Sequence, residues 1–118
     1  MQAVVETASF RKSAAQAGMT EEEIVRLIDF LAANPEAGDE IKGTGGCRKV
    51  RVAGRGKGKS GGYRIITFFS GPTFPLFLFF AYSKSAKSDL DGKQRNSLRG
   101  VTKDIVETYG KRPLRSVK

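Results

Sequence analysis

The sequence predicts an α+β fold, in which helices pack on one face of a small antiparallel sheet. Two observations support this class. Apolar residues recur at helical spacing in two parts of the chain, and three strand-like runs follow one another between residues 47 and 82. The expected order is strand, helix, helix, strand, strand, strand, helix. At 118 residues the chain has the length of one domain, which we expect over residues 1–110, with a basic tail over residues 111–118.

The first elements are a short strand and a helix. The strand is expected over Met1–Glu6. Thr7 or Ser9 can cap the helix that follows, because a side-chain oxygen there satisfies a free backbone N–H of the first turn. Gly18 is a natural place for this helix to stop.

The second helix has a clear start and end. Thr20 and Glu23 stand three residues apart and predict a capping box, and a run of three glutamates suits the positive end of the helix dipole. Asn34 and Pro35 end the helix. Its apolar residues recur at helical spacing: Ile24, Leu27, Ile28 and Leu31.

Strands follow a glycine-rich region, since eight of the 14 glycines lie between residues 43 and 62. Cys47–Ala53 alternates, which predicts apolar side chains on one face and cations on the other. A basic loop, GRGKGKSGG, separates it from strands expected over Tyr63–Phe69 and Leu76–Tyr82. The final helix is expected to end at Gly110 and to bury a face made of Leu98, Val101, Ile105 and Tyr109.

The net charge of +9 is unevenly distributed along the chain. Residues 1–41 hold three basic and eight acidic side chains, a net charge of −5, so residues 42–118 hold 18 basic and four acidic ones, a net charge of +14. Eight basic residues and no acidic residue lie between positions 42 and 64. Such a one-sided field indicates a polyanionic partner, with nucleic acid first and an acidic protein second.

Several classes of protein are not expected. The one cysteine, Cys47, cannot form an internal disulfide, and without histidine the usual zinc and iron ligand sets are missing, so we expect a reduced cytoplasm and neither metal nor cofactor. The longest apolar stretch, Phe74–Tyr82, has nine residues, fewer than the roughly 20 of a membrane helix. No signal peptide is visible, so we expect a cytoplasmic protein that does not bind membranes.

Two sequence features suggest a ligand-binding site but are better explained by the fold. Gly58, Lys59 and Ser60 resemble the end of a phosphate-binding loop, but Ala53 occupies the place of its first glycine, and a strand rather than a helix follows. Most of the phenylalanines between residues 68 and 80 are expected in the core. Tyr63 and Tyr82 remain candidates for contact with bases, because tyrosine tolerates a wet edge.

The cationic strand face predicts a site for phosphate. Lys49 and Arg51 share one face, and Arg64 on the next strand can join them. Like charges opposite one another destabilise a sheet, so the arrangement favours an anionic ligand, with a solvated surface face as the alternative. Such a site can cleave RNA through the neighbouring 2′-hydroxyl, with arginines clamping the phosphate and, in place of histidine, a lysine as base, because neighbouring cations lower the pKa of a lysine.

The residues KGTGGCRKVRVAGRGKGKSGGYRIITFF (Lys42–Phe69) and FLFFAYSKSAKSDL (Phe77–Leu90) form three motifs in order. They resemble the RelE/HigB-like branch of the RelE/ParE toxin superfamily, and HigB-type toxins most of all. The resemblance implies a RelE-like, microbial RNase-like fold and the toxin of a type II toxin–antitoxin system. It also implies metal-independent cleavage of mRNA in the ribosomal A site, leaving a 2′,3′-cyclic phosphate.

Site residues are carried over from this resemblance by position. The general base is Lys49 or Lys87, the pentavalent phosphate is stabilised by Arg51 and Arg64, and Lys84 contacts phosphate. Further RNA contacts are assigned to Arg48, Lys57, Lys59, Tyr63 and Tyr82. Ser85 and Asp91 stand where the best-known RelE proteins have an arginine and a late tyrosine, which indicates a divergent active site.

The implied partners are the 70S ribosome with its mRNA and a helix-turn-helix, HigA-like antitoxin, with operator DNA bound only through the antitoxin complex. A strongly basic chain suits an acidic antitoxin. Two alternatives stay open. One is a ParE-like poison of DNA gyrase, which needs no cluster of catalytic cations, and the other is a noncatalytic RNA- or ribosome-binding protein.

Overall fold

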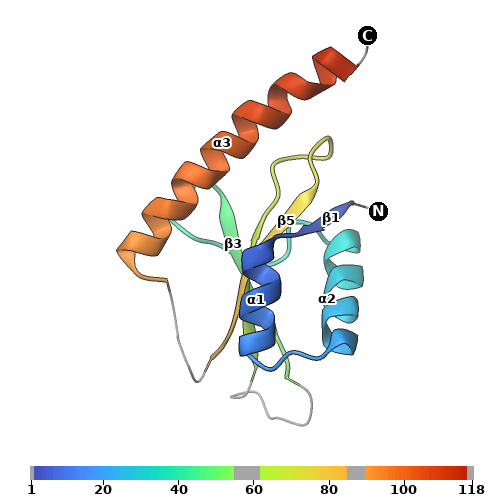
Figure 1. Ribbon diagram of the computed structural model, residues 1–118, viewed down its shortest axis with the longest axis vertical. Coiled ribbons are helices and arrows are strands. Elements are labelled where there is room, and N and C mark those ends of the chain that lie inside the picture. The colour runs from blue at the N-terminus through green and yellow to red at the C-terminus, as the bar shows by residue number, and fades with distance from the viewer. Residues whose placement is uncertain (1, 55–61, 85–89, 117–118) are drawn as a thin grey trace.

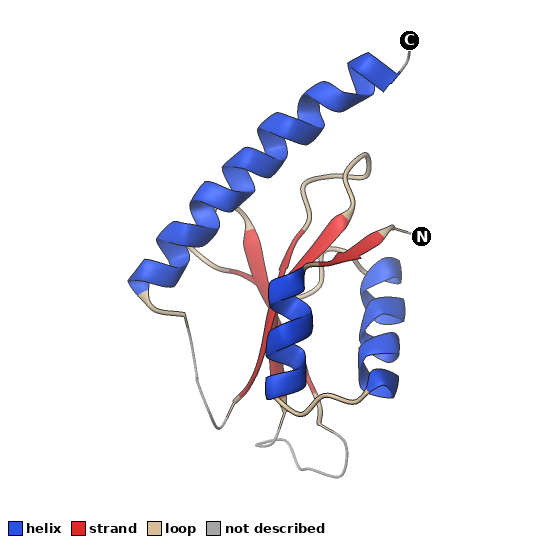
Figure 2. Ribbon diagram, viewed as in Figure 1, coloured by secondary structure: helices blue, strands red, loops and turns tan. Residues whose placement is uncertain are grey.

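The computed structural model describes residues 2–54, 62–84 and 90–116, and it has helices packed on both sides of a central sheet (Figures 1 and 2). In chain order the elements are β1 (Val4–Glu6), α1 (Ala8–Gln16), α2 (Glu21–Ala33), β2 (Asp39–Glu40), β3 (Cys47–Val52), β4 (Tyr63–Phe68), β5 (Leu76–Ser83) and α3 (Gly92–Ser116). The α+β class is therefore confirmed.

The sheet has five strands in the order β1-β5-β4-β3-β2. Strands β2 to β5 pair antiparallel, as expected, but β1 runs parallel to β5, with Val4 opposite Leu76. The sheet is mixed for a topological reason. Each connection within the β2–β5 meander is shorter than the roughly dozen residues that a parallel crossover needs, which favours antiparallel pairing, whereas two helices separate β1 from the rest and leave its direction free.

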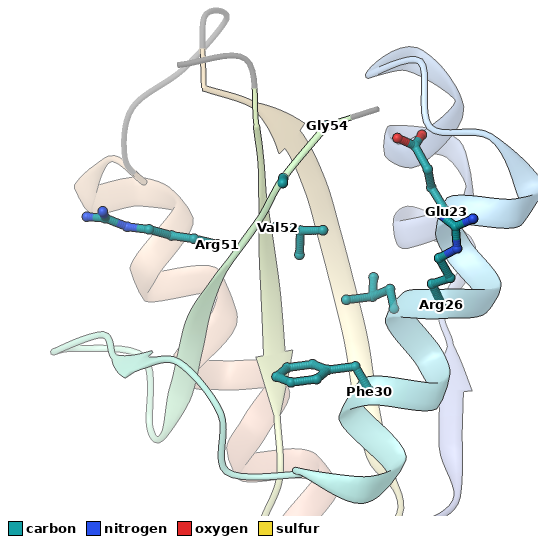
Figure 3. A pocket seen from close by; sticks show the side chains of 8 residues that line it. Glu23, Arg26, Phe30, Arg51, Val52 and Gly54 are labelled. Carbon is teal, nitrogen blue, oxygen red and sulfur yellow. The ribbon is translucent and has the colours of Figure 1, made fainter. Parts of the chain in front are cut away.

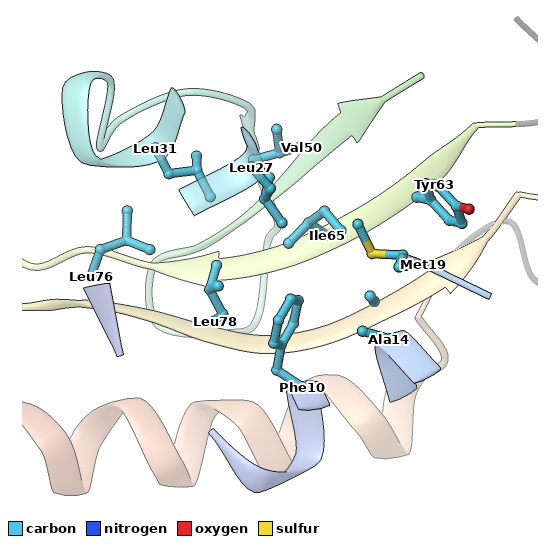
Figure 4. Close-up of a cluster of buried hydrophobic side chains, with 11 residues drawn as sticks. Phe10, Ala14, Met19, Leu27, Leu31, Val50, Tyr63, Ile65, Leu76 and Leu78 are labelled. Atoms are coloured by element: carbon cyan, nitrogen blue, oxygen red, sulfur yellow. The ribbon is translucent and has the colours of Figure 1, made fainter. Parts of the chain in front are cut away.

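Helices cover both faces of the sheet, where the sequence predicted one. Helices α1 and α2 pack against a core that includes Ile65 and Leu78, whereas α3 packs against Ile66 and Phe79 on the other face. All six residues of β4 are buried. A strand with apolar residues on both sides needs cover on both sides, and the adjacent Ile65 and Ile66, which belong to the two different cores, were the signal for it. Figure 4 shows the core beneath α1 and α2.

Most local predictions are confirmed. Thr7 caps α1, and Thr20 with Glu23 forms both hydrogen bonds of the capping box that starts α2. Helix α2 ends one residue before Asn34. The phenylalanines Phe68, Phe77 and Phe79 lie in the core beneath α3.

Three features differ from the prediction. The two-residue strand β2 was not expected, and it places acidic Asp39 and Glu40 opposite basic Lys49 and Arg48. Helix α3 continues through Gly110 to Ser116, because a glycine inside a helix costs only about 1 kcal/mol and neighbouring residues can outweigh it. Val101, which was expected on the buried face of this helix, is 42% exposed.

Thr102 is buried in place of Val101, and it fixes α3 to the loop before β3. Its hydroxyl donates to the carbonyl of Thr44, with an oxygen–oxygen distance of 2.9 Å. Gly45 lies directly against this hydroxyl at a positive φ of 79°. The glycine motif in this loop therefore allows the backbone to approach α3 closely.

We predict that Gly45→Ala lowers the free energy of unfolding by about 2–4 kcal/mol, because the new methyl group collides with Thr102 Oγ1 and a positive φ is strained. Gly43→Ala is the matched control, since Gly43 also has a positive φ but has nothing near its missing Cβ. We expect that control to cost about 1 kcal/mol. Urea unfolding of both variants measures the difference, and equal losses would contradict the role assigned to Gly45.

Burial raises the pKa of the Cys47 thiol from 9.0 to about 11. The folded protein therefore retains a proton that the unfolded chain releases, and this stabilisation is complete below pH 9 and is lost as the pH rises toward 11. We predict a fall in unfolding free energy of up to about 1.4 kcal/mol per pH unit in this window. Urea unfolding across the window should show a shallower fall in Cys47→Ala, and identical pH dependence would refute the prediction.

Candidate active site

The candidate site is a row of three side chains that crosses the sheet. Arg51 on β3 lies directly opposite Arg64 on β4, and Arg64 lies directly opposite Tyr82 on β5. Directly opposite residues share a face of the sheet, with Cβ atoms about 5 Å apart. The three side chains thus lie on the face that α3 covers, beyond the apolar residues that α3 contacts.

Arg64 is the most buried member of the row, with only 6% of its surface exposed. Its Nη1 donates to the backbone carbonyl of Tyr63 at 3.3 Å. Within the described residues, the structure shows an ion pair between Arg26 and Glu22 and none that involves Arg64. A cation that is largely removed from water gains from an anionic partner. An anionic ligand at this position would be such a partner.

Arg51 gives a second reason to expect an anionic ligand, because it is an exposed cation directly opposite Arg64. Two like charges in that position repel each other and weaken the strand pairing. Guanidinium groups bind phosphate oxygens through two parallel hydrogen bonds. A single phosphate between the two arginines would therefore convert the repulsion into attraction.

Two lysines border the row. Lys49 precedes Arg51 by two residues on the same face of β3, and Asp39 of β2 lies opposite it. Lys84 is exposed just beyond β5, and its backbone N–H donates to the Gly62 carbonyl at 3.0 Å. This bond holds Lys84 at the same end of the sheet as Arg64. Lys57, Lys59 and Lys87 lie outside the described residues.

Arg48 and Tyr63 lie on the opposite face of the sheet. Arg48 donates to the Gly38 carbonyl at 3.0 Å. The Tyr63 ring belongs to the core beneath α1 and α2 and is 6% exposed, so it has no open face on which a base can stack. The sequence placed both among the RNA contacts, and the structure does not bring them to the row.

Tyr63 instead anchors the start of β4 to α2. Its hydroxyl donates to Glu23 Oε1 at 3.3 Å, the same oxygen that accepts from the Thr20 N–H at 2.9 Å in the capping box. Burial, and then the charge and hydrogen bond of Glu23, raise the pKa of Tyr63. Sequence analysis missed this contact because it joins residues 40 positions apart. It fixes the backbone beside Arg64.

Asp91, one of the two departures from the best-known RelE proteins, has a structural role. Its carboxylate accepts from the Gln94 N–H at 2.8 Å, and the Gln94 side chain accepts from the Asp91 N–H at 3.0 Å. This reciprocal pair caps the start of α3. The spacing of Asp91 and Gln94 was a visible signal for it.

No group of three or more His, Cys, Asp or Glu side chains suited to a metal ion occurs within the described ranges. Over the same part of the chain, no helix is long and apolar enough to cross a membrane.

Comparison with known families decides the identity. The model of the family described as "RelE toxin of RelE / RelB toxin-antitoxin system" matches residues 2–116. The chain belongs to the RelE toxin family. It is therefore a toxin of a toxin–antitoxin system, with a cognate antitoxin as its partner. Toxins of the RelE family are generally endoribonucleases, and the cationic row is the feature of this toxin that suits such chemistry.

We predict that Tyr63→Phe lowers the unfolding free energy of the toxin by about 1 kcal/mol, because it removes the hydrogen bond to Glu23 and little volume. Thermal or urea unfolding checks the loss. Glu23→Gln is the companion variant, since it removes the charge and keeps an acceptor for Tyr63. Unchanged stability in Tyr63→Phe would contradict the anchoring role.

Proposed function

We propose that this RelE-family toxin is a ribosome-dependent, metal-independent endoribonuclease that cleaves mRNA in the ribosomal A site. The observation that carries the proposal is the buried Arg64 between Arg51 and Tyr82 on one sheet face. The dependence on the ribosome and the likeness to HigB-type toxins rest on the three sequence motifs.

The reaction we propose needs no group beyond the RNA and the side chains. A base removes the proton of the 2′-hydroxyl, and the oxygen attacks the adjacent phosphorus to form the 2′,3′-cyclic phosphate. The bond to the 5′-oxygen breaks, and that oxygen takes a proton from the protonated base or from a neighbouring lysine and leaves as a hydroxyl group. Lys49 and Lys87 are the two candidates for the base.

The arginines would act where negative charge develops. Arg51 and Arg64, which are opposite each other on β3 and β4, would hold the non-bridging oxygens of the pentavalent phosphate. Donors that are fixed in advance stabilise such a transition state strongly. Lys84 at the end of β5 would contact a neighbouring phosphate. Tyr82 would stack on a base beside the scissile bond.

The test is Arg64→Ala, with Arg26→Ala as the matched control, because Arg26 is an exposed arginine on the far side of the sheet. We predict that Arg64→Ala reduces cleavage about a hundredfold or more and abolishes growth arrest on induction, whereas the control keeps both. Primer extension on a translated message, with and without ribosomes, measures cleavage. A thermal melt confirms that both variants fold.

Three results would overturn the proposal. Equal cleavage by Arg64→Ala and the control would remove the row from the chemistry. Persistent toxicity with broken DNA and intact mRNA would indicate a gyrase poison. Ribosome binding without cuts would indicate a noncatalytic protein.

A further inference from the structure

Helix α3 carries three cations that the candidate active site does not use. Arg95, Arg99 and Lys103 follow one another at intervals of four residues, so they form one ridge along the helix, the α3 ridge. Arg99 and Lys103 are exposed, and Arg95 is half-buried. Like charges at this spacing destabilise a helix. An anion bound along the ridge would relieve that repulsion.

One end of the α3 ridge borders a hollow between the helix and the glycine loop before β3. The hollow has a volume of about 300 Å³ and is lined by Gly45, Arg99, Thr102, Lys103, Val106 and Glu107. Gly45 lies against the side chain of Thr102 and close to the backbone of Arg99. Two cations against one carboxylate make this lining positive. A positive concave surface concentrates the field and attracts anions.

The other end of the α3 ridge begins beside the row of Arg51, Arg64 and Tyr82. Gln94, in the first turn of α3, lines a second hollow together with Tyr82, and Arg95 is the next residue. Figure 3 shows the pocket between α2 and β3, and the side chain of Arg51 points away from it, toward the side of the sheet on which α3 lies. The ridge therefore leads from the row to the glycine loop.

We propose that the α3 ridge and the hollow beside Gly45 bind the phosphate backbone of the RNA strand whose scissile phosphate lies at the row. The cations of the ridge recur about every 6 Å along the helix axis, a repeat similar to that of the phosphates in an extended single strand. Grooves that track a backbone with cations bind single-stranded RNA with little regard to sequence. RNA as the ligand rests on the proposed function.

The α3 ridge would contribute affinity and not chemistry. Its three cations span eight residues, which is about 12 Å of helix, so the phosphates that they hold lie outside the reacting centre. Contacts of this kind strengthen the binding of substrate and transition state alike. The ridge thus differs from Arg64, which is proposed to act on the scissile phosphate itself.

The test measures binding of the full-length toxin to a single-stranded RNA of about 12 nucleotides. Each ribose carries a 2′-O-methyl group, which prevents cleavage, and fluorescence anisotropy reports the affinity. The ridge variant combines Arg99→Ala with Lys103→Ala. The matched control combines Arg11→Ala with Lys12→Ala, which removes one exposed arginine and one exposed lysine from α1, the helix on the other face of the sheet. Thermal melts establish that both variants fold.

We expect the ridge variant to bind this RNA about tenfold or more weakly than wild type. The slope of log affinity against log salt concentration should become shallower by about 1.4, since each of two lost phosphate contacts contributes about 0.7 for a single strand. The control should stay near wild type. Equal losses in the two variants would show a general effect of net charge and overturn the site.

A second arm separates the RNA strand from the ribosome as the ligand. Cosedimentation of each variant with ribosomes that carry no message measures contact with ribosomal RNA. Normal binding of the ridge variant to the single strand, with loss of binding to these ribosomes, would assign the ridge to ribosomal RNA and refute the proposal. Neither arm uses cleavage. A toxin that leaves mRNA intact, but whose ridge variant loses affinity for the single strand, would contradict the nuclease proposal alone and support the ridge.

Discussion

The double burial of strand β4 is the constraint on which the rest of the structure depends. All six of its residues are buried, so each face of the sheet must be covered by helices, and β3 and β5 must flank it on both edges. Helices α1 and α2 cover one face, and α3 crosses the other. The position of α3 in turn requires the close contact between Thr102 and the glycine loop before β3.

Strand β4 also carries Arg64, which lies on the face covered by α3, beyond the apolar residues that α3 contacts. On the α3 face the cross-strand rows change from the apolar set Cys47, Phe68 and Phe77 to the polar set Arg51, Arg64 and Tyr82. Burial, which stabilises the first row, also affects Arg64, the most buried member of the second row, and favours an anionic partner for it. A stable core and a phosphate-binding site are thus built from one set of strands.

Local patterns were the most predictable part of this fold. The capping box of Thr20 and Glu23 and the alternation of β3 need only neighbours along the chain, and both are present. The pairing of Tyr63 with Glu23 was not predictable, because it depends on how α2 lies over the sheet. The alternation of β3 also placed Lys49 and Arg51 on one face correctly. The same alternation in β3 and β4 turns Arg48 and Tyr63, two of the predicted RNA contacts, to the other face.

The sequence by itself determined the α+β class, the local starts of the helices, the family and the cationic character of the second half of the chain. These follow from residue types at fixed spacing. Only the tertiary structure decided that β1 is parallel to β5, that helices cover both faces, and that Arg51, Arg64 and Tyr82 form one row. Strand register and helix placement are set by long-range burial, since a shift of one residue would turn every side chain to the other face.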